Sequence, residues 1–511
     1  MKAANLVPKL LGEDLELAGA IIGGPGDSFT GDEATRRVLD QVGGFPFAED
    51  DEKSSVAYFN RYDSQRNYLP NGGCLYQDCG HVECCTAEVR SARDHVGAHH
   101  AMLRLAQAAA ARANARLPAG RRIELGARNS DGFGNSFAAH LSLLLSREAW
   151  RCATSQLDAM SWWASALVSM PIYTGQGKVG SERSAGTPPG GYQLSSRAEF
   201  FESFVGFQTT ERRPLINVRD EALCGERDET FARLHVIFFD SNLCNHAHWL
   251  KCGVLQILGA MLEAQCWKHT QVLADPEAAA VAWSGDPTLR TRARTAHRRS
   301  LTALEHQRLI CESAAKFVGT GACEGVVPEA DAIIAAWSET LMRLGQGDTP
   351  WLARRLDWVL KKQLLEGALA EGAWDSPEGK MLDHRYGVLG EGGLYFACEK
   401  AGLTEQLTPP DVTALFATQP PADTRAWTRG RLLELALDRP EAVHAVNWDH
   451  IVFQFDGDES RWRVTLDDPL GCTAATSPIR EATTLAQALT ALAGAGLLKE
   501  EPRRRHFSYA Y

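Results

Sequence analysis

No apolar stretch of the sequence approaches the roughly 20 residues that a helix needs to cross a bilayer, so we expect no membrane span. The first residues also lack the apolar run and small-residue cleavage site of a secretory signal. No internal repeat or long low-complexity tract is present, which excludes a repeat architecture. Acidic residues outnumber basic ones, which gives a net charge of -11. This charge argues against a nucleic-acid-binding protein dominated by phosphate contacts.

The sequence also lacks a disulfide framework. Its 13 cysteines are odd in number and scattered, and several lie inside apolar segments, namely Cys252, Cys266 and Cys311. We therefore expect reduced, buried thiols and a cytoplasmic protein. The remaining composition, 44% hydrophobic and 23% charged, is ordinary for a globular protein. It suits an enzyme whose ligands are small, or whose anions are met by metals and local arginines.

The length of 511 residues favours a large core with one smaller appended unit. Short β-rich runs and longer helical patterns alternate, which predicts an α+β fold. Strands are predicted at about 13–17, 73–78, 123–129, 233–239, 450–455 and 462–466, and helices at about 91–116, 250–264, 303–317, 330–344 and 424–437. We predict a catalytic domain over 1–415 with an acidic surface loop at about 43–68, a small C-terminal domain over 416–500, and a basic tail over 501–511.

Acidic side chains gather on two of the predicted strands. Asp14 and Glu16 are two residues apart, so they share one strand face at a separation of roughly 6–7 Å. A second cluster contains Asp78, Glu83 and Glu88. Carboxylate oxygens are the ligands that Mg²⁺ prefers, so both clusters are candidate metal sites. The alternative for the first pair is a solvent-facing edge strand.

Histidine and cysteine leave further alternatives open. His235 lies inside the most apolar predicted strand, where it is either a metal ligand or a hydrogen-bonded core residue. The second acidic segment also carries soft ligands for a structural zinc ion, Cys79, His81, Cys84 and Cys85. No second CxxC pair completes a tetrahedral site at a familiar spacing.

Three basic residues are candidates for binding phosphate or carboxylate. Lys178 lies in a glycine-rich turn whose backbone amides can approach phosphate, although the turn does not match the Walker pattern. Arg219 and Arg233 are candidate clamps for an anionic group. Each of the three is, by itself, equally compatible with a surface salt bridge.

Taken in order, these segments resemble the family of the Pup ligase and the Pup deamidase/depupylase. Gly12–Leu17 is similar to the opening G-x-E-x-E-[YF] strand of the family, and Asn71–Asp78 is similar to its N-G-A-R-L-Y-x-D segment. The similarity covers about Gly12 to Gly471. The further similar stretches are His81–Glu83, Thr86–Glu88, Asn129–Ser136, His140, Gln193–Arg197, Ile216–Glu221, Arg233–Ile237, Asp240–Asn242 and Pro420–Ala426.

The resemblance implies a glutamine-synthetase-like fold, in which a curved antiparallel sheet forms a cradle covered by helices. It implies ATP as cofactor and two or more Mg²⁺ sites. Asp78 matches the catalytic aspartate of the family. The implied nucleotide-binding residues are Arg219, Arg233, Lys178 and Arg425, and the implied metal ligands are Asp14, Glu16, Glu83, Glu88, His140 and His235.

The reaction implied by the resemblance is activation of a C-terminal glutamate side chain as an acyl phosphate, followed by attack of a lysine amine. The partners would be a small Pup-like protein or peptide ending in Glu or Gln and a lysine-bearing acceptor protein, with no nucleic acid or membrane. The ligase is the preferred interpretation. The alternative within the family is a deamidase/depupylase that hydrolyses the same amide or isopeptide.

Several positions depart from the family pattern, namely Asp14, Leu17, Leu141, Ala222, Leu223 and Asn245. Leu141 and Asn245 stand where the family has an acid, so they bring part of the metal shell into question. The departures keep a hypothesis of another class open, in which the chain is a paralogue that binds a modifier protein or a nucleotide without catalysis.

Overall fold

The computed structural model describes residues 6–23, 31–43, 45–48, 65–182, 190–370, 373–455, 457 and 460–501. The predicted acidic loop at 43–68 lies largely outside these residues, as does nearly all of the basic tail. Among the helices of the described part, none combines the length and apolar character that a bilayer crossing requires.

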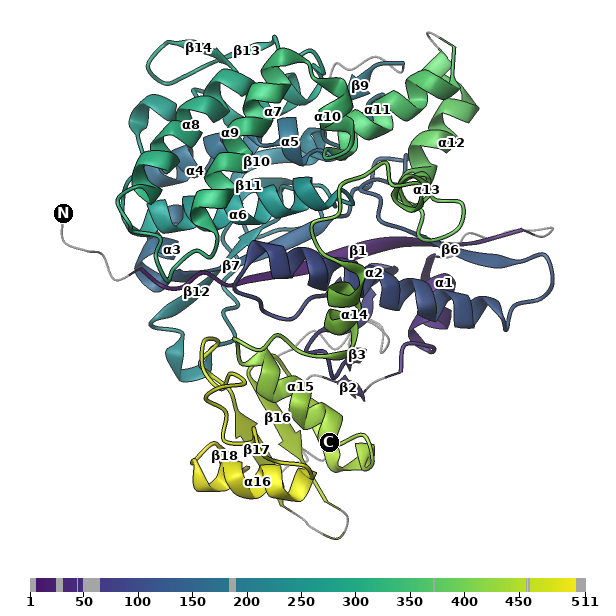
Figure 1. Cartoon of the computed structure of the whole chain (residues 1–511), viewed down its shortest axis with the longest axis vertical. Coiled ribbons are helices and arrows are strands. Elements are labelled where there is room, and N and C mark those ends of the chain that lie inside the picture. The colour runs from purple at the N-terminus through teal and green to yellow at the C-terminus, as the bar shows by residue number, and fades with distance from the viewer. Residues whose placement is uncertain are drawn as a thin grey trace, which may run out of the picture.

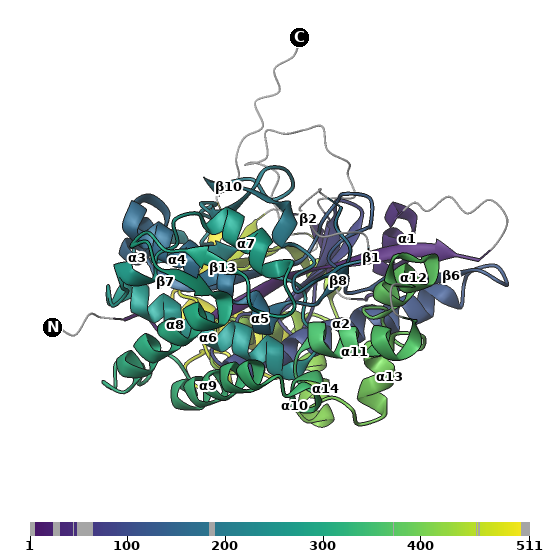
Figure 2. The same ribbon diagram turned by 90° about the horizontal axis from the view of Figure 1, so that it is seen from above.

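An eight-stranded antiparallel sheet forms the centre of the molecule, and the long strand β1 runs through its middle (Figures 1 and 2). The strand order is β12-β7-β1-β5-β4-β3-β2, with β6 paired to the far end of β1. The bounds are β1 Leu11–Ile22, β2 Phe45–Ala48, β3 Gln65–Tyr68, β4 Cys74–Asp78, β5 His81–Cys85, β6 Arg122–Gly126, β7 Ala139–Ser146 and β12 Phe231–Val236. The predicted α+β fold with an antiparallel sheet is confirmed.

Strand β1 is central because its two neighbours, β7 and β5, pair with it on opposite sides. The alternative of a solvent-facing edge strand for Asp14 and Glu16 is therefore wrong. Leu15 and Leu17 are fully buried on the other face of β1, where they join the main core. Alternation of side chains along the strand thus separates an acidic face from an apolar face.

Helices cover the apolar face of the sheet, led by α2 (Ala92–Asn114) and α6 (Asn245–Glu263), which pack on each other. Ser91 caps α2 by accepting a hydrogen bond from the Asp94 amide, and its alanine-rich sequence favours the helix. The other helices are α1 Gly31–Leu39, α3 Arg147–Ser155, α4 Leu157–Ser169, α5 Pro171–Thr174, α7 Pro276–Ser284, α8 Ala303–Val318, α9 Ala330–Gln346, α10 Thr349–Ala353, α11 Asp357–Ala368, α12 Pro377–Arg385, α13 Leu394–Lys400 and α14 Pro410–Thr418.

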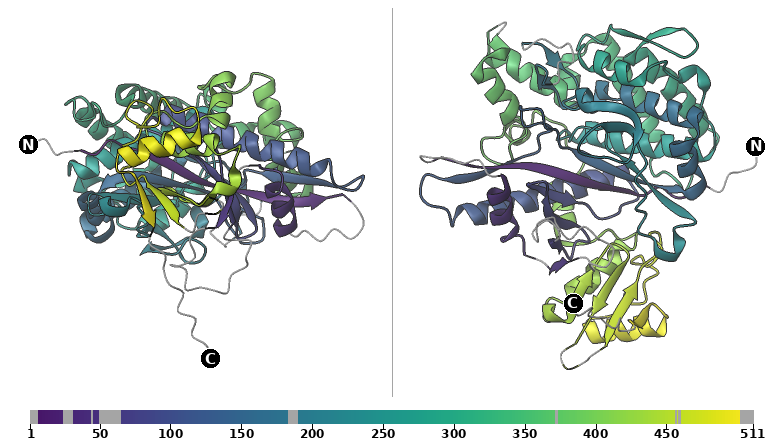
Figure 3. Two further views of the ribbon diagram at one scale, coloured as in Figure 1. Left: turned by 90° about the horizontal axis from the view of Figure 1, so that it is seen from below. Right: turned by 180° about the vertical axis from the view of Figure 1, so that it is seen from behind.

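The C-terminal part has its own four-stranded sheet and lies below the main sheet in Figure 1 and in the right-hand view of Figure 3. Its apolar cluster includes Leu432, Ile451 and Val464, and it continues into Cys74 and Tyr76 of the main sheet. The C-terminal elements are α15 Ala426–Leu435, β15 Val443–Val446, β16 His450–Phe453, β17 Arg461–Thr465, α16 Leu485–Gly494 and β18 Leu498–Glu501. Three two-stranded pairs complete the strands, β8 Lys178–Val179 with β9 Tyr192–Gln193, β10 Phe201–Gly206 with β11 Arg213–Asn217, and β13 Arg292–Arg294 with β14 Ser300–Thr302.

Candidate active site

The face of the sheet away from α2 and α6 carries a row of acidic and imidazole side chains. In the register of the sheet, Asp14 lies opposite His140, and Glu16 lies opposite Glu83. Residues directly opposite in antiparallel strands share a face, so the four side chains project from the same side. Four predicted metal residues from three strands are thereby brought together.

The carboxylates of this row are crowded; Glu16 and Glu83 are buried and Asp14 is partly exposed. Ligand atoms of Asp14, Glu83 and Cys85 all lie within 4.8 Å of one another. Burial, together with the charges of Asp14 and Asp78, raises the pKa of Glu83 well above its usual range. One carboxylate oxygen of Glu83 has no hydrogen-bond partner among the described residues. A divalent cation bound here would reduce the repulsion between the carboxylates and would supply a partner for the unpaired oxygen of Glu83.

Glu16 lies next to Glu83 in the sheet, and one of its carboxylate oxygens accepts a hydrogen bond from the backbone. The Ala138 amide donates a hydrogen bond to its carboxylate at 2.6 Å. Burial raises the pKa of Glu16 to about 7, and the charge of Asp78 contributes in the same direction. The backbone contact fixes the orientation of the carboxylate, which prepares it for a ligand on its other oxygen.

Asp78 is the last residue of β4 and lies opposite His81 across a two-residue turn. Both turn residues have positive φ, 46° at Cys79 and 84° at Gly80, which is the geometry of a tight hairpin. The hairpin places Asp78 on the same face as Glu83, since the two are separated by an even number of positions in the register. Asp78 is partly exposed, so it faces both the acidic row and solvent.

Tyr76 is a site residue that sequence reasoning missed. It pairs directly with Glu83 in the register, and its hydroxyl hydrogen-bonds to the Glu83 carboxylate. The Arg66 guanidinium lies 4.1 Å from the centre of the Tyr76 ring. The sequence does contain a pattern that places Tyr76 at the site, because Tyr76 is two residues before Asp78 and therefore lies on the same strand face.

His140 and His235 lie at the other end of the row, with ring centres 5.4 Å apart. Burial, followed by the charges of Arg197 and Arg213, lowers the pKa of His140 well below its usual range. Burial, followed by the charge of Arg233, lowers the pKa of His235 well below its usual range. The two ring nitrogens of His235 have no hydrogen-bond partner among the described residues. Neutral imidazoles are competent metal ligands. Neither histidine, however, lies within 4.8 Å of two other potential ligands in the described structure.

Arginines surround the histidine end. Arg233 contacts Asp14 at 3.8 Å and Glu221 at 3.2 Å, and Arg219 contacts Glu221 at 3.4 Å. Two further arginines were not predicted as site residues: Arg197 and Arg213 both donate hydrogen bonds to Ser136. The face therefore changes from negative at the carboxylates to positive at the arginines, which is the charge pattern that metal ions and phosphate groups together require.

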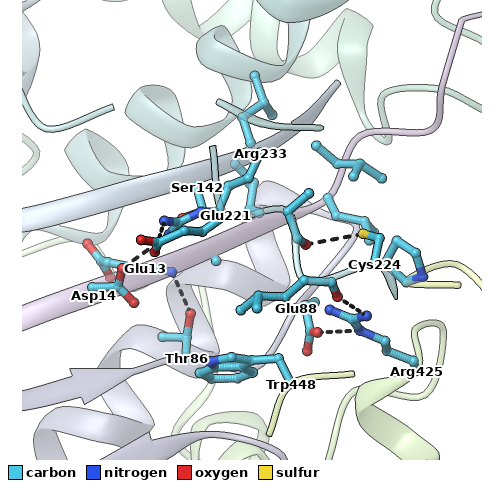
Figure 4. Close-up of a pocket in the computed structure, with 18 residues that line it drawn as sticks. Glu13, Asp14, Thr86, Glu88, Ser142, Glu221, Cys224, Arg233, Arg425 and Trp448 are labelled. Atoms are coloured by element: carbon cyan, nitrogen blue, oxygen red, sulfur yellow. Dashed lines mark hydrogen bonds and ion pairs between the residues drawn. The ribbon is translucent and has the colours of Figure 1, made fainter. Parts of the chain in front are cut away.

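A cavity opens between this sheet face and the C-terminal unit, as Figure 4 shows. Asp14 and Arg233 line it from the sheet, and Trp448 lines it from the C-terminal unit. The other polar residues at its wall include Thr86, Glu88, Ser142, Glu221, Cys224 and Arg425. The cavity thus combines an acidic floor, cationic side chains and one large aromatic ring.

Three predicted site residues, Glu88, Arg425 and Lys178, form ion pairs with other side chains in the structure. Glu88 lies between two arginines: Arg425 donates to one carboxylate oxygen at 2.9 Å, and Arg429 donates to the other at 2.5 Å. Lys178 donates to Glu199 and, at 3.1 Å, to Glu182, inside a buried network. In the structure Glu88 thus accepts hydrogen bonds from two arginines, and Lys178 is a buried ion-pair partner. Their roles as metal ligand and phosphate contact stay predictions.

The soft-ligand alternative does not form. No group of three close metal-competent side chains in the described structure contains Cys79, His81 or Cys84. Adjacent Cys84 and Cys85 point to opposite faces of β5, as strand alternation requires.

Two of the departures from the family pattern lie away from the acidic face. Leu141 pairs with Glu13, so it faces the helices, where it is fully buried. Asn245 begins α6 and contacts His100 at 2.9 Å. Leu223, by contrast, lines the cavity, and its carbonyl accepts a hydrogen bond from Arg425.

Known proteins match most of this chain. The family described as Pup-ligase protein matches residues 31–452. A depupylase of Acidothermus cellulolyticus is 35% identical over 430 residues, covering 83% of each chain. A Pup–protein ligase of Kocuria rhizophila is 32% identical over 421 residues, covering 80% of this chain and 87% of the relative.

Solved structures show the same fold. The ligase PafA in complex with the prokaryotic ubiquitin-like protein Pup matches with a TM-score of 0.76 at 24% identity, over 91% of this chain and 90% of that one. PafA in complex with ADP matches with a TM-score of 0.70 at 26% identity, over 82% and 89%. From the family match and the identity to curated relatives, the chain belongs to the Pup-ligase family.

Proposed function

We propose that this chain is an ATP- and Mg²⁺-dependent ligase that joins the C-terminal glutamate side chain of a Pup-like protein to a lysine amine of an acceptor protein. The proposal rests chiefly on the row of Asp14, Glu16 and Glu83, which lies beside a cavity that Arg233 and Trp448 line. Membership of the family, relatives that are Pup–protein ligases, and the match to PafA with ADP support the proposal.

The carboxylate row fits Mg²⁺ because its donors are mostly hard oxygens at close spacing. Asp14, Glu16 and Glu83 would hold the ions, and His140 and His235 are proposed as ligands at the far end of the same row. Bound Mg²⁺ neutralises charge on the phosphates during phosphoryl transfer. Burial is the main cause of the raised pKa values of Glu16 and Glu83. Nearby carboxylates act in the same direction, namely Asp78 on Glu16, and Asp14, Asp78 and Glu16 on Glu83.

The arginines bind the phosphate groups in this proposal. Arg233 pairs with Asp14 and Glu221 in the structure. When ATP binds, a phosphate group replaces these two carboxylates as the partner of Arg233. Arg219 is nearly half exposed at the same edge, with 45% of its side chain accessible, so it can reach an incoming anion. Arg425 contributes indirectly, since its guanidinium holds Glu88 and the Leu223 carbonyl at the cavity wall.

Asp78 acts as the base. The glutamate carboxylate of the modifier first accepts the terminal phosphoryl group of ATP, which gives an acyl phosphate and ADP. Asp78 then removes a proton from the lysine ammonium, the free amine attacks the acyl carbon, and inorganic phosphate leaves. The partly exposed position of Asp78 at the end of β4 suits this role, because the acceptor lysine arrives from solvent.

The test is a reconstituted ligation. The chain is incubated with ATP, Mg²⁺, a Pup-like protein ending in glutamate and a lysine-bearing acceptor, and conjugate and ADP are measured. We expect conjugate with the wild-type chain, a fall of about 10²–10⁴-fold with Asp78→Asn, and at least a tenfold higher Mg²⁺ requirement with Glu16→Gln. The exposed Glu441→Gln is the matched control and should behave as wild type. Absence of ATP binding and conjugate in the wild-type chain refutes the proposal.

A second candidate, depupylase activity, is supported by identities of 33–35% to depupylases of Acidothermus, Mycolicibacterium and Mycobacterium. In that case Asp78 assists hydrolysis of the isopeptide, as nucleophile or by activating water. Incubation with a preformed conjugate separates the candidates. Release of free acceptor without net ligation favours the hydrolase. Nucleotide binding with neither reaction favours a non-catalytic paralogue.

A further inference from the structure

A second cluster of potential metal ligands lies on the opposite side of β1, between the sheet and helices α2 and α6. His95 and His99 are four residues apart on α2, and His248 and Cys252 are four residues apart on α6. Residues at this spacing project from the same helix face. The two helices pack on each other, so the two pairs face one another.

Three ligand atoms of the cluster converge. The distance from His95 Nδ1 to His248 Nε2 is 2.8 Å, and that from His95 Nδ1 to Cys252 Sγ is 3.4 Å. All three atoms lie within 4.8 Å of one another. A proton on His95 Nδ1 can be donated to His248 Nε2 or to Cys252 Sγ, and the other of these two atoms then receives no hydrogen bond from His95. A metal ion at this point accepts a lone pair from each of the three atoms.

A fourth ligand is available from β1. The Glu13 carboxylate lies 2.6 Å from His99 Nδ1 and 4.0 Å from His248 Nε2. Ligand atoms of Glu13, His99 and His248 form a second group within 4.8 Å, so His248 belongs to both groups. The other oxygen of Glu13 and the Nε2 atom of His99 are buried without a hydrogen-bond partner among the described residues.

The cluster is closed to solvent. His95, His99, His248 and Cys252 each have 0% exposure, and Glu13 has 1%. Burying this many polar groups costs several kcal/mol unless each is paired. Lys251 also reaches Glu13 at 3.8 Å, so the carboxylate has a cationic neighbour independent of the histidines.

We propose that His95, His248 and Cys252, with Glu13 or His99 as fourth ligand, form a structural zinc site behind the active sheet. Mixed imidazole and thiolate donors select zinc over Mg²⁺. Zinc bonds of about 2.0–2.3 Å require only small adjustments from the observed spacings. The site fastens α2 and α6 to the back of β1, and it is separate from the carboxylate row, which projects from the other face.

The test measures metal in untagged protein, so that a histidine tag does not contribute. We expect about one zinc per chain after exhaustive dialysis, and X-ray absorption of the wild-type zinc should show one sulfur with two or three imidazole nitrogens. Replacement by Co²⁺ should give thiolate-to-cobalt absorption in the near ultraviolet. Removal of zinc by a chelator should lower the thermal midpoint, and added zinc should restore it.

Variants locate the site. Cys252→Ala should lose the zinc and the cobalt-thiolate band. Cys311→Ala, which removes another buried thiol, should keep both. Cys85→Ala is the second control, because Cys85 belongs to the group with Asp14 and Glu83. Less than a tenth of a zinc per wild-type chain together with no cobalt-thiolate band overturns the proposal. So does a zinc shell without sulfur, or zinc that is lost from Cys85→Ala and kept by Cys252→Ala. The wild-type measurements decide the question even where Cys252→Ala does not fold.

Discussion

Replacing Glu88 with glutamine separates the role that the structure gives this residue from the metal-ligand role that its sequence context indicates. The carboxylate accepts hydrogen bonds from Arg425 and Arg429, and Arg429 also donates to the carbonyls of Gly72 and Trp448. Glu88 therefore joins the main sheet region to the C-terminal unit. Its removal leaves two buried guanidinium groups without their carboxylate.

The magnitude follows from the pKa of Glu88. Burial opposes ionisation, but Arg429 and Arg425 lower the pKa from 4.5 to about 2. At about 1.36 kcal/mol per pKa unit, the ionised form contributes about 3 kcal/mol to the free energy of unfolding. Because the folded pKa is below the unfolded one, this contribution is complete above pH 4.5 and is lost as the pH falls towards 2. Glutamine resembles the protonated acid, so Glu88→Gln should cost about 3 kcal/mol at neutral pH.

The assay is urea unfolding followed by tryptophan fluorescence, with Glu441→Gln as the exposed control. We expect Glu88→Gln to lower the free energy of unfolding by about 3 kcal/mol and to weaken its acid dependence between pH 4.5 and 3. The Mg²⁺ concentration for half-maximal activity should stay within about twofold of wild type. A stability change below about 1 kcal/mol, combined with a tenfold or greater rise in that Mg²⁺ concentration, refutes the reasoning and returns Glu88 to the metal shell.

Two further predictions test other parts of the site. Trp448→Ala removes the aromatic wall of the cavity and should weaken ATP binding about tenfold or more, measured by calorimetric titration, if the adenine base stacks there; unchanged affinity places the base elsewhere. Lys178→Met removes the ammonium group that pairs with the buried Glu199 and should lower the free energy of unfolding in urea by about 3–5 kcal/mol. The ATP affinity of the folded fraction should stay within about twofold, and selective loss of ATP affinity makes Lys178 a phosphate contact.

Strand periodicity predicted the acidic row well, because alternation is a local rule. It placed Asp14 and Glu16 on one face and Leu15 and Leu17 on the other, as the structure has them. It did not show that β1 is central. That property depends on pairing with β5 and β7, whose contacts are distant in sequence.

The local rule fails for Glu88, because β5 ends at Cys85 and the alternation ends with it. Arg429, which accounts for the position of Glu88, is 341 residues away and has no sequence pattern that links the two. The contacts of Lys178 could not be predicted from the sequence for the same reason. A glycine-rich turn is visible in the sequence. The Glu199 carboxylate, which accepts a hydrogen bond from the Lys178 ammonium group, is brought next to it by tertiary packing.

Strand β1 carries functional groups on both faces, and this constrains how the active site is held. Asp14 and Glu16 project towards the cavity side, and Glu13 projects into the histidine cluster between α2 and α6. Catalytic ligands need positions fixed to about 0.5 Å, and a backbone shift at Glu13 moves its neighbour Asp14 directly. Glu13 contacts His99 and Lys251 on that side, while Leu15 and Leu17 of the same face pack into the main core. These polar and apolar contacts together fix the register of β1, because a slip of one residue would turn its carboxylates to the other face of the sheet.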